Sequence, residues 1–561
     1  MENFPWVKEY PQGVASTVDY SQYSSLVDML DQAFRKYADL KAFDNMGKTY
    51  TYKEIDEASR AFAAYLQKGM GLKKGDRIAI QMPNCLQYPV AMFGALRAGL
   101  VVVNTNPLYT PREMKHQFKD AGVKAVVIMS MFAHHLEEVL PETDIQHVVV
   151  TDLGDMLGGL KGSLVNFVVK KVKKMVPDYK LPKAIPFKEV LSKGKKYIFD
   201  KPEIKPEDLA FLQYTGGTTG VAKGAMLSHR NVVAHTLQIT EWFKPLLEKG
   251  KQEIMITAIP LYHIFALAVN GIFMTHIGAR NILVTNPRDM KAFLKDLKKF
   301  PFTLITGVNT LYNGLLNQPD FSSVDFSHLK TAIGGGMAVQ KAVAEKWKKV
   351  TGISLVEGYG LSETSPVLSV NPLDGRENQG TIGLPVPNTE MAIFDEEGNK
   401  MGVGEVGEIC ARGPQVMQGY WNRPEDSENA FFHKEWFRTG DMGIMQADGY
   451  FKIVDRKKDM INVSGFNVYP NEIEDIIAMH PKVLEIAAIG IPDERSSEVV
   501  KACVVKKDPS LTKDELIAYC RENMTAYKVP KVVEFREELP KSNVGKILRR
   551  LLREEGEQKT M

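Results

Sequence analysis

Short apolar runs recur along the first two-thirds of the chain and alternate with segments of helical periodicity. The first runs are DRIAIQMP (76–83), LVVVNTNP (100–107) and KAVVIMS (124–130). After Lys201 they return as IMITAIP, RNILVTN, FTLITGV, KTAIGGG and SLVEGYG. Apolar strands that alternate with amphipathic helices such as TPREMKHQFKDAG form parallel sheets with helices on their faces. The pattern therefore predicts an α/β protein with two α/β layers.

Beyond about Gly380 the chain changes to short alternating strands broken by glycine, proline and asparagine. Examples are TIGLPVPNTEMAIFDEEGN, VGEICARGPQVMQGY and GYFKIVDRKKDMI, which predict a small β-rich unit. The charged segment DRKKD (455–459) then precedes an amphipathic helix, PNEIEDIIAMHP, and a mixed α+β set. We predict a large N-terminal domain over residues 1–454 and a smaller C-terminal domain over 460–561, joined by an exposed charged segment.

The segment SLVNFVVKKVKKMV (163–176) combines apolar and basic residues at helical spacing. One helical face would carry Val165, Val168, Val169, Val172 and Val176. The basic residues opposite this face and on its flanks are Lys170, Lys171, Lys173 and Lys174. A basic amphipathic helix can lie in a membrane interface, and a surface helix that packs its valines on the core fits the same pattern. Both interpretations stand.

Composition narrows the class of protein. The chain has 561 residues, 44% apolar and 25% charged, which fits a globular protein of more than one domain. A net charge of +3 does not favour nucleic acid as a partner. The four cysteines, at 85, 410, 503 and 520, form no CxxC pair, so neither disulfides nor a zinc site is expected. The N-terminus lacks the apolar core of a signal peptide, and no apolar run could span a bilayer, so we expect a soluble, cytoplasmic protein.

The loop YTGGTTGVAKG, Tyr214 to Gly224, is dense in glycine and threonine and ends near Lys223. It matches neither the Walker A spacing nor the dinucleotide-binding G-x-G-x-x-G. It still meets the needs of phosphate binding, because glycines allow close approach of backbone N–H groups and the lysine adds positive charge. The sequence therefore predicts a phosphate-binding loop.

Three other motifs place polar residues where a site could form. They are EGYGLSE (357–363) after a predicted strand, RTGD (438–441) with a carboxylate that could hold a sugar diol, and PKSNVGKILRR (540–550) with a lysine after a turn. Strand ends in α/β sheets are where ligands bind. Taken singly, each motif also suits a turn, a cap or a solvated side chain.

Together, and in this order, the motifs resemble those of the adenylate-forming superfamily of acyl-CoA synthetases, luciferases and peptide-synthetase adenylation domains. The resemblance covers nearly the whole chain. EWFRTGDMGIMQADGYFKIVDRKKDM (435–460) resembles the signature of fatty acyl-CoA synthetases, and PLYHIFAL, NPRDM and VSGFNVYPNEIED are similar to bacterial long-chain fatty acid–CoA ligases. Ser362 stands where the family usually has threonine and keeps the hydroxyl.

The resemblance implies ATP-dependent ligation of a long-chain fatty acid to coenzyme A through acyl-AMP, with Mg²⁺ as cofactor. It implies that the triphosphate is held by Tyr214, Thr215, Gly216, Gly217, Thr218, Thr219, Gly220 and Lys223. The nucleoside would contact Gly335, Gly336, Glu357, Gly358, Tyr359, Gly360, Ser362, Asp441 and Arg456. Thr215 and Glu363 would bind the metal, and the catalytic residues would be Lys546, Glu363 and Lys223. His263 would border the acyl site, although a lone histidine in an apolar segment also suits the core.

Because Lys546 follows the segment 455–459, the resemblance also implies that the C-terminal domain is mobile. It would rotate about Lys458 between one orientation that delivers Lys546 and another that opens a coenzyme A route past Gly465. Dimers are common in the superfamily. Fatty acids partition into bilayers, so weak peripheral association with the cytoplasmic face of the inner membrane is expected.

Several alternatives remain open at this point. An enzyme of this fold could use a medium-chain or aryl acid, stop at acyl-AMP, oxidise it as luciferases do, or load a carrier protein. The chain could also be a nucleotide-regulated fatty acid-binding protein without turnover, which the presence of Lys546, Glu363 and Asp441 argues against.

Overall fold

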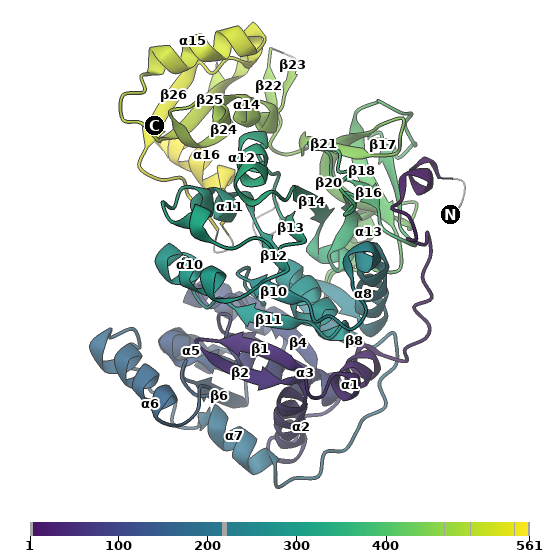
Figure 1. Cartoon of the computed structure of the whole chain (residues 1–561), viewed down its shortest axis with the longest axis vertical. Coiled ribbons are helices and arrows are strands. Elements are labelled where there is room, and N and C mark those ends of the chain that lie inside the picture. Colours follow the sequence, from purple (N-terminus) through teal and green to yellow (C-terminus); the bar gives the residue numbers. More distant parts are fainter. Residues whose placement is uncertain (1–3, 216–221, 465, 494, 543–544, 559–561) are drawn as a thin grey trace.

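The computed structural model describes the chain except residues 1–3, 216–221, 465, 494, 543–544 and 559–561 (Figure 1). Within the described residues the strands form four sheets, of seven, nine, five and five strands. The two larger sheets are the predicted α/β layers, so that prediction is confirmed.

The seven-stranded sheet has the order β7-β6-β5-β3-β4-β8-β9, and only β8 and β9 pair antiparallel. Its strands are β3 (Arg77–Gln81), β4 (Val101–Asn104), β5 (Val123–Met129), β6 (His147–Thr151), β7 (Ile185–Pro186), β8 (Leu209–Thr215) and β9 (Lys223–Ser228). The predicted phosphate-binding loop joins β8 to β9. Hairpin pairing brings Thr215 opposite Lys223 at the base of that loop.

The nine-stranded sheet has the order β16-β15-β14-β13-β12-β10-β11-β1-β2. Its strands are β1 (Lys41–Asn45), β2 (Lys48–Thr51), β10 (Ile254–Thr257), β11 (Arg280–Leu283), β12 (Leu304–Gly307), β13 (Thr331–Gly334), β14 (Leu355–Gly360), β15 (Val367–Val370) and β16 (Leu384–Pro385). The stretch from β14 to β1 is parallel, and β2, β15 and β16 are antiparallel. The carboxyl ends of β13 and β14 carry two of the predicted glycine-rich motifs.

Helices cover both sheets, and the two layers share one core. The α-helices of this part are α1 (Leu26–Lys36), α2 (Tyr52–Lys68), α3 (Gln87–Arg97), α4 (Pro111–Ala121), α5 (Ala133–Val139), α6 (Gly159–Phe167), α7 (Phe187–Gly194), α8 (His229–Phe243), α9 (Met274–His276), α10 (Met290–Lys299), α11 (Asn309–Leu316) and α12 (Lys341–Thr351). A single core cluster contains Ile80 of β3, Met255 of β10 and Phe93 of α3. Every residue of α3 is buried, because this helix lies within that shared core.

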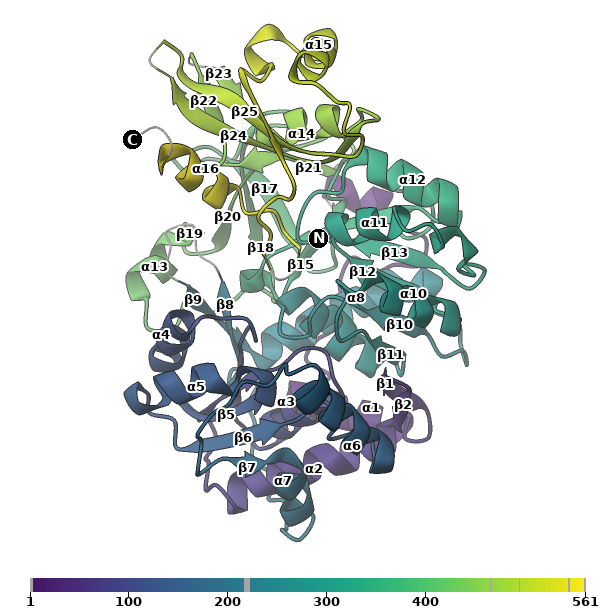
Figure 2. The same ribbon diagram turned by 90° about the vertical axis from the view of Figure 1, so that its left-hand side faces the viewer.

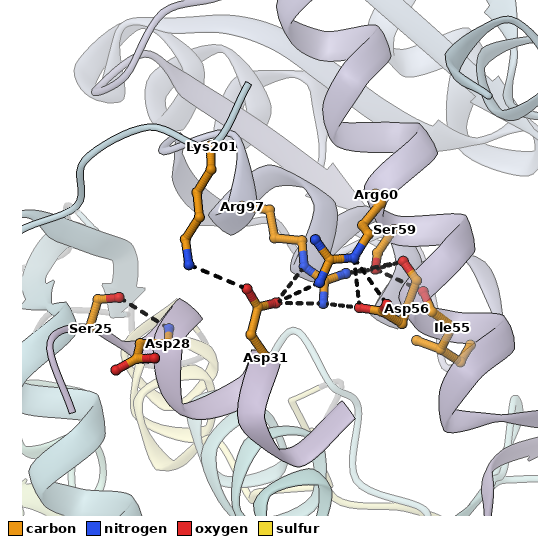
Figure 3. Close-up of polar contacts among 9 residues, drawn as sticks. All are labelled: Ser25, Asp28, Asp31, Ile55, Asp56, Ser59, Arg60, Arg97 and Lys201. Atoms are coloured by element: carbon orange, nitrogen blue, oxygen red, sulfur yellow. Dashed lines mark hydrogen bonds and ion pairs between the residues drawn. The ribbon is translucent and has the colours of Figure 1, made fainter. Parts of the chain in front are cut away.

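Arg97 at the end of α3 is buried and is neutralised by a cluster of charged residues (Figure 3). Its guanidinium contacts the carboxylate of Asp31 in α1 at 2.8 Å and also pairs with Asp56 in α2. Arg60 contacts Asp56 at 3.0 Å, and Lys201 lies 3.7 Å from Asp31. A buried charge is tolerated only when it is paired and hydrogen-bonded. The cluster therefore ties α1, α2 and α3 together.

The five-stranded sheet that follows consists of β17 (Glu390–Phe394), β18 (Gly407–Arg412), β19 (Phe431–Phe432), β20 (Trp436–Met445) and β21 (Phe451–Arg456), with α13 (Pro424–Asn429) beside it. The C-terminal part has its own sheet of β22 (Ile461–Val463), β23 (Phe466–Val468), β24 (Val483–Asp493), β25 (Ser497–Lys506) and β26 (Val532–Arg536). Its helices are α14 (Pro470–Ala478), α15 (Lys513–Asn523) and α16 (Arg549–Gln558). These C-terminal elements lie next to α11 and α12 in both views (Figures 1 and 2), and they enclose a separate core.

The charged segment 455–459 is less exposed than the sequence predicts. Asp455 is fully buried and accepts hydrogen bonds from the backbone N–H of Asn471, at 2.8 Å, and from Arg549, at 3.3 Å. Arg553 binds Asp459 at 2.6 Å. The physical reason is that α14 and α16 fold back on the segment, so its carboxylates pair with the partly buried Arg549 and Arg553.

The predicted amphipathic helix 163–176 also differs from the structure. The helix begins earlier, as α6, and continues as a π-helix, Val168–Val172. The wider π turn changes which residues face the protein, so Val169 is buried whereas Val172 is 63% exposed. Lys170 does not face solvent freely, because it pairs with Asp152 at 2.6 Å. The exposed apolar residues of this region are Leu160, Leu164, Phe167, Val172 and Met175.

Two further expectations can be compared with the described residues. The four cysteines are buried free thiols. Among the helices that the structure describes, none has the length and apolar character needed to cross a bilayer.

The charged cluster around Arg97 generates a stability prediction. Arg97→Met should lower the free energy of unfolding by about 3–5 kcal/mol, because Asp31 would stay buried without its main partner. Arg60→Met is the matched control: its side chain is 37% exposed, and its loss should cost less than about 1 kcal/mol. Urea denaturation of the two variants measures the difference. If both variants lose the same free energy of unfolding, burial of the Arg97–Asp31 ion pair does not determine how much it stabilises the protein.

Candidate active site

A cavity of about 630 Å³ lies at the carboxyl ends of β8, β13 and β14. There these strands meet the five-stranded sheet of β17–β21 and the C-terminal domain. Its size suits a small-molecule ligand. The predicted site residues on its wall are Tyr214, Thr215, Lys223, His263, Gly335, Gly336, Gly358, Tyr359, Gly360, Ser362, Glu363, Arg456 and Lys546. Six predicted residues lie outside the described part of the chain: Gly216, Gly217, Thr218, Thr219, Gly220 and Gly465. The fold thus brings together residues that are far apart in the sequence.

Two glycines on the wall are required by close approaches of the chain. A Cβ at Gly360 would lie 1.9 Å from the carbonyl oxygen of Pro366, so no other residue fits there without rearrangement. A Cβ at Gly335 would lie 3.0 Å from the ring of Phe265. The glycines therefore let β13 and β14 approach their neighbours closely and keep this side of the cavity open.

Glu357 does not line the cavity, although the sequence places it with the nucleoside-binding residues. Its carboxylate accepts a hydrogen bond from the backbone N–H of Val339, at 3.1 Å, and burial raises its pKa to about 7. The side chain therefore holds the turn after β13 in place.

Asp441 is buried just behind the wall and binds two residues that line it. Its Oδ2 accepts a hydrogen bond from the hydroxyl of Tyr359 at 2.6 Å, and its Oδ1 lies 3.2 Å from Nε of Arg456. β20 and β21 pair Asp441 directly with Arg456. The predicted proximity of these two residues is therefore observed, and the carboxylate also orients the tyrosine ring.

Lys223 is held by groups that the sequence did not reveal. Its ammonium pairs with Asp426 and lies 5.4 Å from the ring centroid of Tyr420. The Tyr420 hydroxyl donates to Oε1 of Glu363 at 2.8 Å. Asp426 and Tyr420 lie in the segment between the recognised motifs, so only the folded chain brings them to the loop. The Lys223 ammonium has three N–H donors, so it could contact an anion in the cavity as well as Asp426.

The residues predicted to bind Mg²⁺ fit a site completed by phosphate oxygens. Thr215 and Glu363 line the same cavity, and burial raises the pKa of the Glu363 carboxyl, a cost that a nearby cation would offset. The described residues contain no group of three or more His, Cys, Asp or Glu able to hold a metal alone. Mg²⁺ commonly takes one or two protein ligands together with phosphates, so the two residues suit it.

Lys546 enters the cavity from the C-terminal domain. Desolvation, followed by the positive charge of Arg456, lowers its pKa to about 7. His263 lies on the same wall, and burial together with the charge of Lys546 lowers its pKa to about 4. The imidazole is therefore neutral at physiological pH. His263 therefore lines the cavity, and its place at the acyl site stays a prediction.

One part of the wall is apolar and was not identified from the sequence. Its residues come from the end of α8 and from the π-helix Ala266–Phe273 and its approach: Ile239, Phe243, Ile264, Phe265 and Val269. Such residues look like ordinary core positions in a sequence. Only their position beside His263 distinguishes them as a candidate acyl-binding wall.

Family comparisons agree with this geometry. The model of AMP-binding enzymes matches residues 30–421, and that of the C-terminal domain of AMP-binding enzymes matches residues 472–546. The chain belongs to the AMP-binding enzyme family. The first match contains Lys223 and Glu363, and the second ends at Lys546, so both matched regions of this family member reach the cavity.

Relatives and solved structures cover nearly the whole chain. A long-chain-fatty-acid–CoA ligase of Escherichia coli O157:H7 is 57% identical over 550 residues, 98% of each chain. One of Haemophilus influenzae is 53% identical over 551 residues, with the same coverage. The crystal structure of the anthranilate CoA ligase AuaEII with anthranoyl-AMP is 25% identical and has a TM-score of 0.85, covering 97% of this chain and 100% of its own.

A further comparison concerns the arrangement of the domains. MatB from Rhodopseudomonas palustris, 27% identical, has an ATP-bound and an apo structure. The ATP-bound form matches with a TM-score of 0.80 and covers 94% of this chain and 98% of its own. The apo form matches with a TM-score of 0.70 and covers 95% of this chain and 100% of its own. The structure described here is thus closer to the ATP-bound form of that protein.

The lowered pKa of Lys546 predicts proton uptake on nucleotide binding. Because this pKa is about 7 in the ligand-free protein, the amine is mostly neutral at pH 8, and a polyanionic triphosphate should raise its pKa and recharge it. At pH 6 Lys546 already carries its proton, so ATP binding should cause no proton uptake by this residue. Calorimetric titration with ATP in buffers of different ionisation enthalpy measures the uptake. Uptake that persists at pH 8 in Lys546→Met would assign the proton to another group.

Proposed function

We infer that this chain is an ATP-dependent ligase that joins long-chain fatty acids to coenzyme A through an acyl-AMP intermediate, releasing AMP and pyrophosphate. The observation that carries this inference is the position of Lys546, from the C-terminal domain, in one cavity with Lys223, Glu363 and Arg456. Identity over nearly the full length to long-chain-fatty-acid–CoA ligases supports the same reaction.

In the first half-reaction a carboxylate oxygen of the fatty acid attacks the α-phosphorus of ATP. The bond from this phosphorus to the oxygen bridging to the β-phosphate breaks, and the electron pair leaves with pyrophosphate. The reaction of two anions needs aligned reactants and positive charge rather than a nucleophilic side chain. We propose that Lys546 supplies charge at the α-phosphate and that Thr215 and Lys223 hold the β- and γ-phosphates.

The remaining polar groups of the cavity would orient the nucleotide. Asp441 would accept hydrogen bonds from the ribose hydroxyls, with Arg456 beside it, and the Tyr359 ring would stack on the adenine. Thr215 and Glu363 would hold Mg²⁺, which when bound neutralises phosphate charge. The buried Tyr359–Asp441 hydrogen bond supports this role, because it fixes both side chains before the ligand arrives.

In the second half-reaction the thiolate of coenzyme A attacks the acyl carbonyl carbon, and the bond to the AMP phosphate oxygen breaks. We propose that the C-terminal domain first rotates about the segment 455–459, with Lys458 as pivot, and withdraws Lys546. Lys458 is exposed, whereas Asp455 is buried, so backbone rotation would begin beyond the buried end of the segment. The proposed coenzyme A route past Gly465 lies outside the described residues.

The acyl chain would lie against the apolar wall beside His263. Ile239 and Phe243 of α8 face the cavity together with Val269, and an apolar lining of this kind stabilises an alkyl chain by removing it from water. A panel of fatty acids of increasing length, and benzoate as an aryl acid, tests this proposal. Faster thioester formation from benzoate than from oleate would contradict it.

The two half-reactions should respond differently to loss of Lys546. Lys546→Ala should slow acyl-AMP formation by about 10²-fold or more, the effect of deleting one charge-stabilising donor. The same variant should still make thioester from preformed acyl-AMP, because that step uses the other orientation. Lys458→Pro should show the reverse pattern, since proline restricts the proposed pivot. Pyrophosphate release and thioester appearance follow the two steps separately, and equal loss of both steps in both variants would contradict domain alternation.

We also propose weak peripheral binding to anionic membranes through α6 and the turn after it. Leu160, Leu164 and Phe167 follow one another at helical spacing and are 91%, 63% and 57% exposed. The exposed lysines nearby are Lys171, Lys173 and Lys174. This end of the molecule lies away from the C-terminal domain in both views (Figures 1 and 2). An apolar face flanked by lysines suits the interface of an anionic bilayer.

Membrane binding can be tested by co-sedimentation with vesicles containing anionic lipid. Replacing Leu164 and Phe167 with Asp should abolish binding, and replacing Lys171, Lys173 and Lys174 with Gln should weaken it by about 1 kcal/mol per lysine. Ile198→Asp is the control, because Ile198 is 82% exposed but lies outside this surface. Binding that is unaffected by both changes and by high salt would rule out the proposed surface.

A further inference from the structure

The loop that carries Lys546 is attached to α11 of the large domain. The hydroxyl of Thr310, in the first turn of this helix, donates a hydrogen bond to the carbonyl oxygen of Gly545 at 2.8 Å. One turn later, the side-chain amide of Asn313 donates to the carbonyl oxygen of Leu484 in β24 at 3.1 Å. Both bonds cross from the large domain to the C-terminal domain, and one of them ends on the residue just before Lys546.

The contact at Gly545 leaves no spare room. Its φ is +82°, and a Cβ there would lie 2.6 Å from Oγ1 of Thr310 and 3.3 Å from Cγ2 of Val308. Within the loop, the N–H of Ser542 donates to the carbonyl oxygen of Lys546 at 2.7 Å. The N–H of Lys546 in turn donates to the Ser542 hydroxyl at 3.1 Å. Because the turn closes on itself, fixing its Gly545 carbonyl also fixes the backbone of Lys546.

Other polar contacts near the segment 455–459 do not depend on the orientation of the C-terminal domain in the same way. Arg549 binds the carboxylate of Glu474 at 2.7 Å and the side chain of Asn471 at 2.6 Å. All three residues follow the segment 455–459, so they would move together when the domain rotates. The bonds of Thr310 and Asn313 have their two ends on opposite sides of that segment and must break.

We propose that Thr310 is a positioning residue for the first half-reaction: its hydroxyl holds the backbone beside Lys546 so that the ammonium lies in the cavity. Asn313 holds the C-terminal domain in the same orientation through β24. Thr310 is not on the wall of the cavity, so it acts through Lys546 and not on the substrate. The inference rests on the proposed alternation of the C-terminal domain.

Isosteric replacement of the hydroxyl tests the proposal. Thr310→Val should slow acyl-AMP formation about fivefold to tenfold, the value of one neutral hydrogen bond, and should leave thioester formation from preformed acyl-AMP unchanged. Thr310→Ser keeps the hydroxyl and should restore the rate. The double variant Thr310→Val/Asn313→Ala should form acyl-AMP more slowly still than Thr310→Val. Gln318→Ala is the control, because among the described residues this amide donates to Gly314 of the same domain, and the change should affect neither step.

The outcomes separate this inference from the function on which it rests. Suppose that Lys546→Ala slows acyl-AMP formation and spares thioester formation while Thr310→Val slows neither step selectively. In that case, or if Thr310→Ser does not restore the rate of acyl-AMP formation, the role of Thr310 is wrong and the proposed function stands. If Lys546→Ala itself loses both steps equally, the alternation is wrong and this inference is overturned with it. Thermal melting identifies a general structural defect, and a lowered melting temperature with equal loss of both steps also counts against a positioning role.

Discussion

The placement of one ammonium group, that of Lys546, is the constraint on which the proposed reaction depends. The group is carried by the small domain but is desolvated inside a cavity of the large one, near Arg456 and Lys458, and Asp441 is the nearby negative charge. Positive charges brought together in this way repel one another. A polyanionic nucleotide would remove the repulsion, so binding of the substrate and docking of the domain should stabilise each other.

The large domain provides the fixed half of this arrangement. Its two sheets share one core with α3, and the buried Arg97 is tolerated there because Asp31 and Asp56 neutralise it. The strands that end at the cavity are therefore held by a continuous packed interior. Close packing continues to the wall itself, where Gly360 has no room for a side chain.

Charged groups around the cavity are paired before any ligand arrives. Lys223 pairs with Asp426, Arg456 with Asp441, and Glu363 accepts a hydrogen bond from Tyr420. Preformed pairs of this kind reduce the cost of burying each charge and keep the side chains oriented.

The sequence by itself determined the two α/β layers and the glycine-rich and charged parts of the cavity wall. Alternating strands and helices predicted two α/β layers, and the glycine-rich loop, Tyr359 and Lys546 were identified from their motifs, because such features depend on residues close together in the chain. Tertiary structure decided the rest. Asp426 reaches Lys223 across 203 residues, and α14 and α16 bury Asp455 in a segment that looked exposed. Each of these depends on packing between distant segments, which leaves no periodic trace in the local sequence.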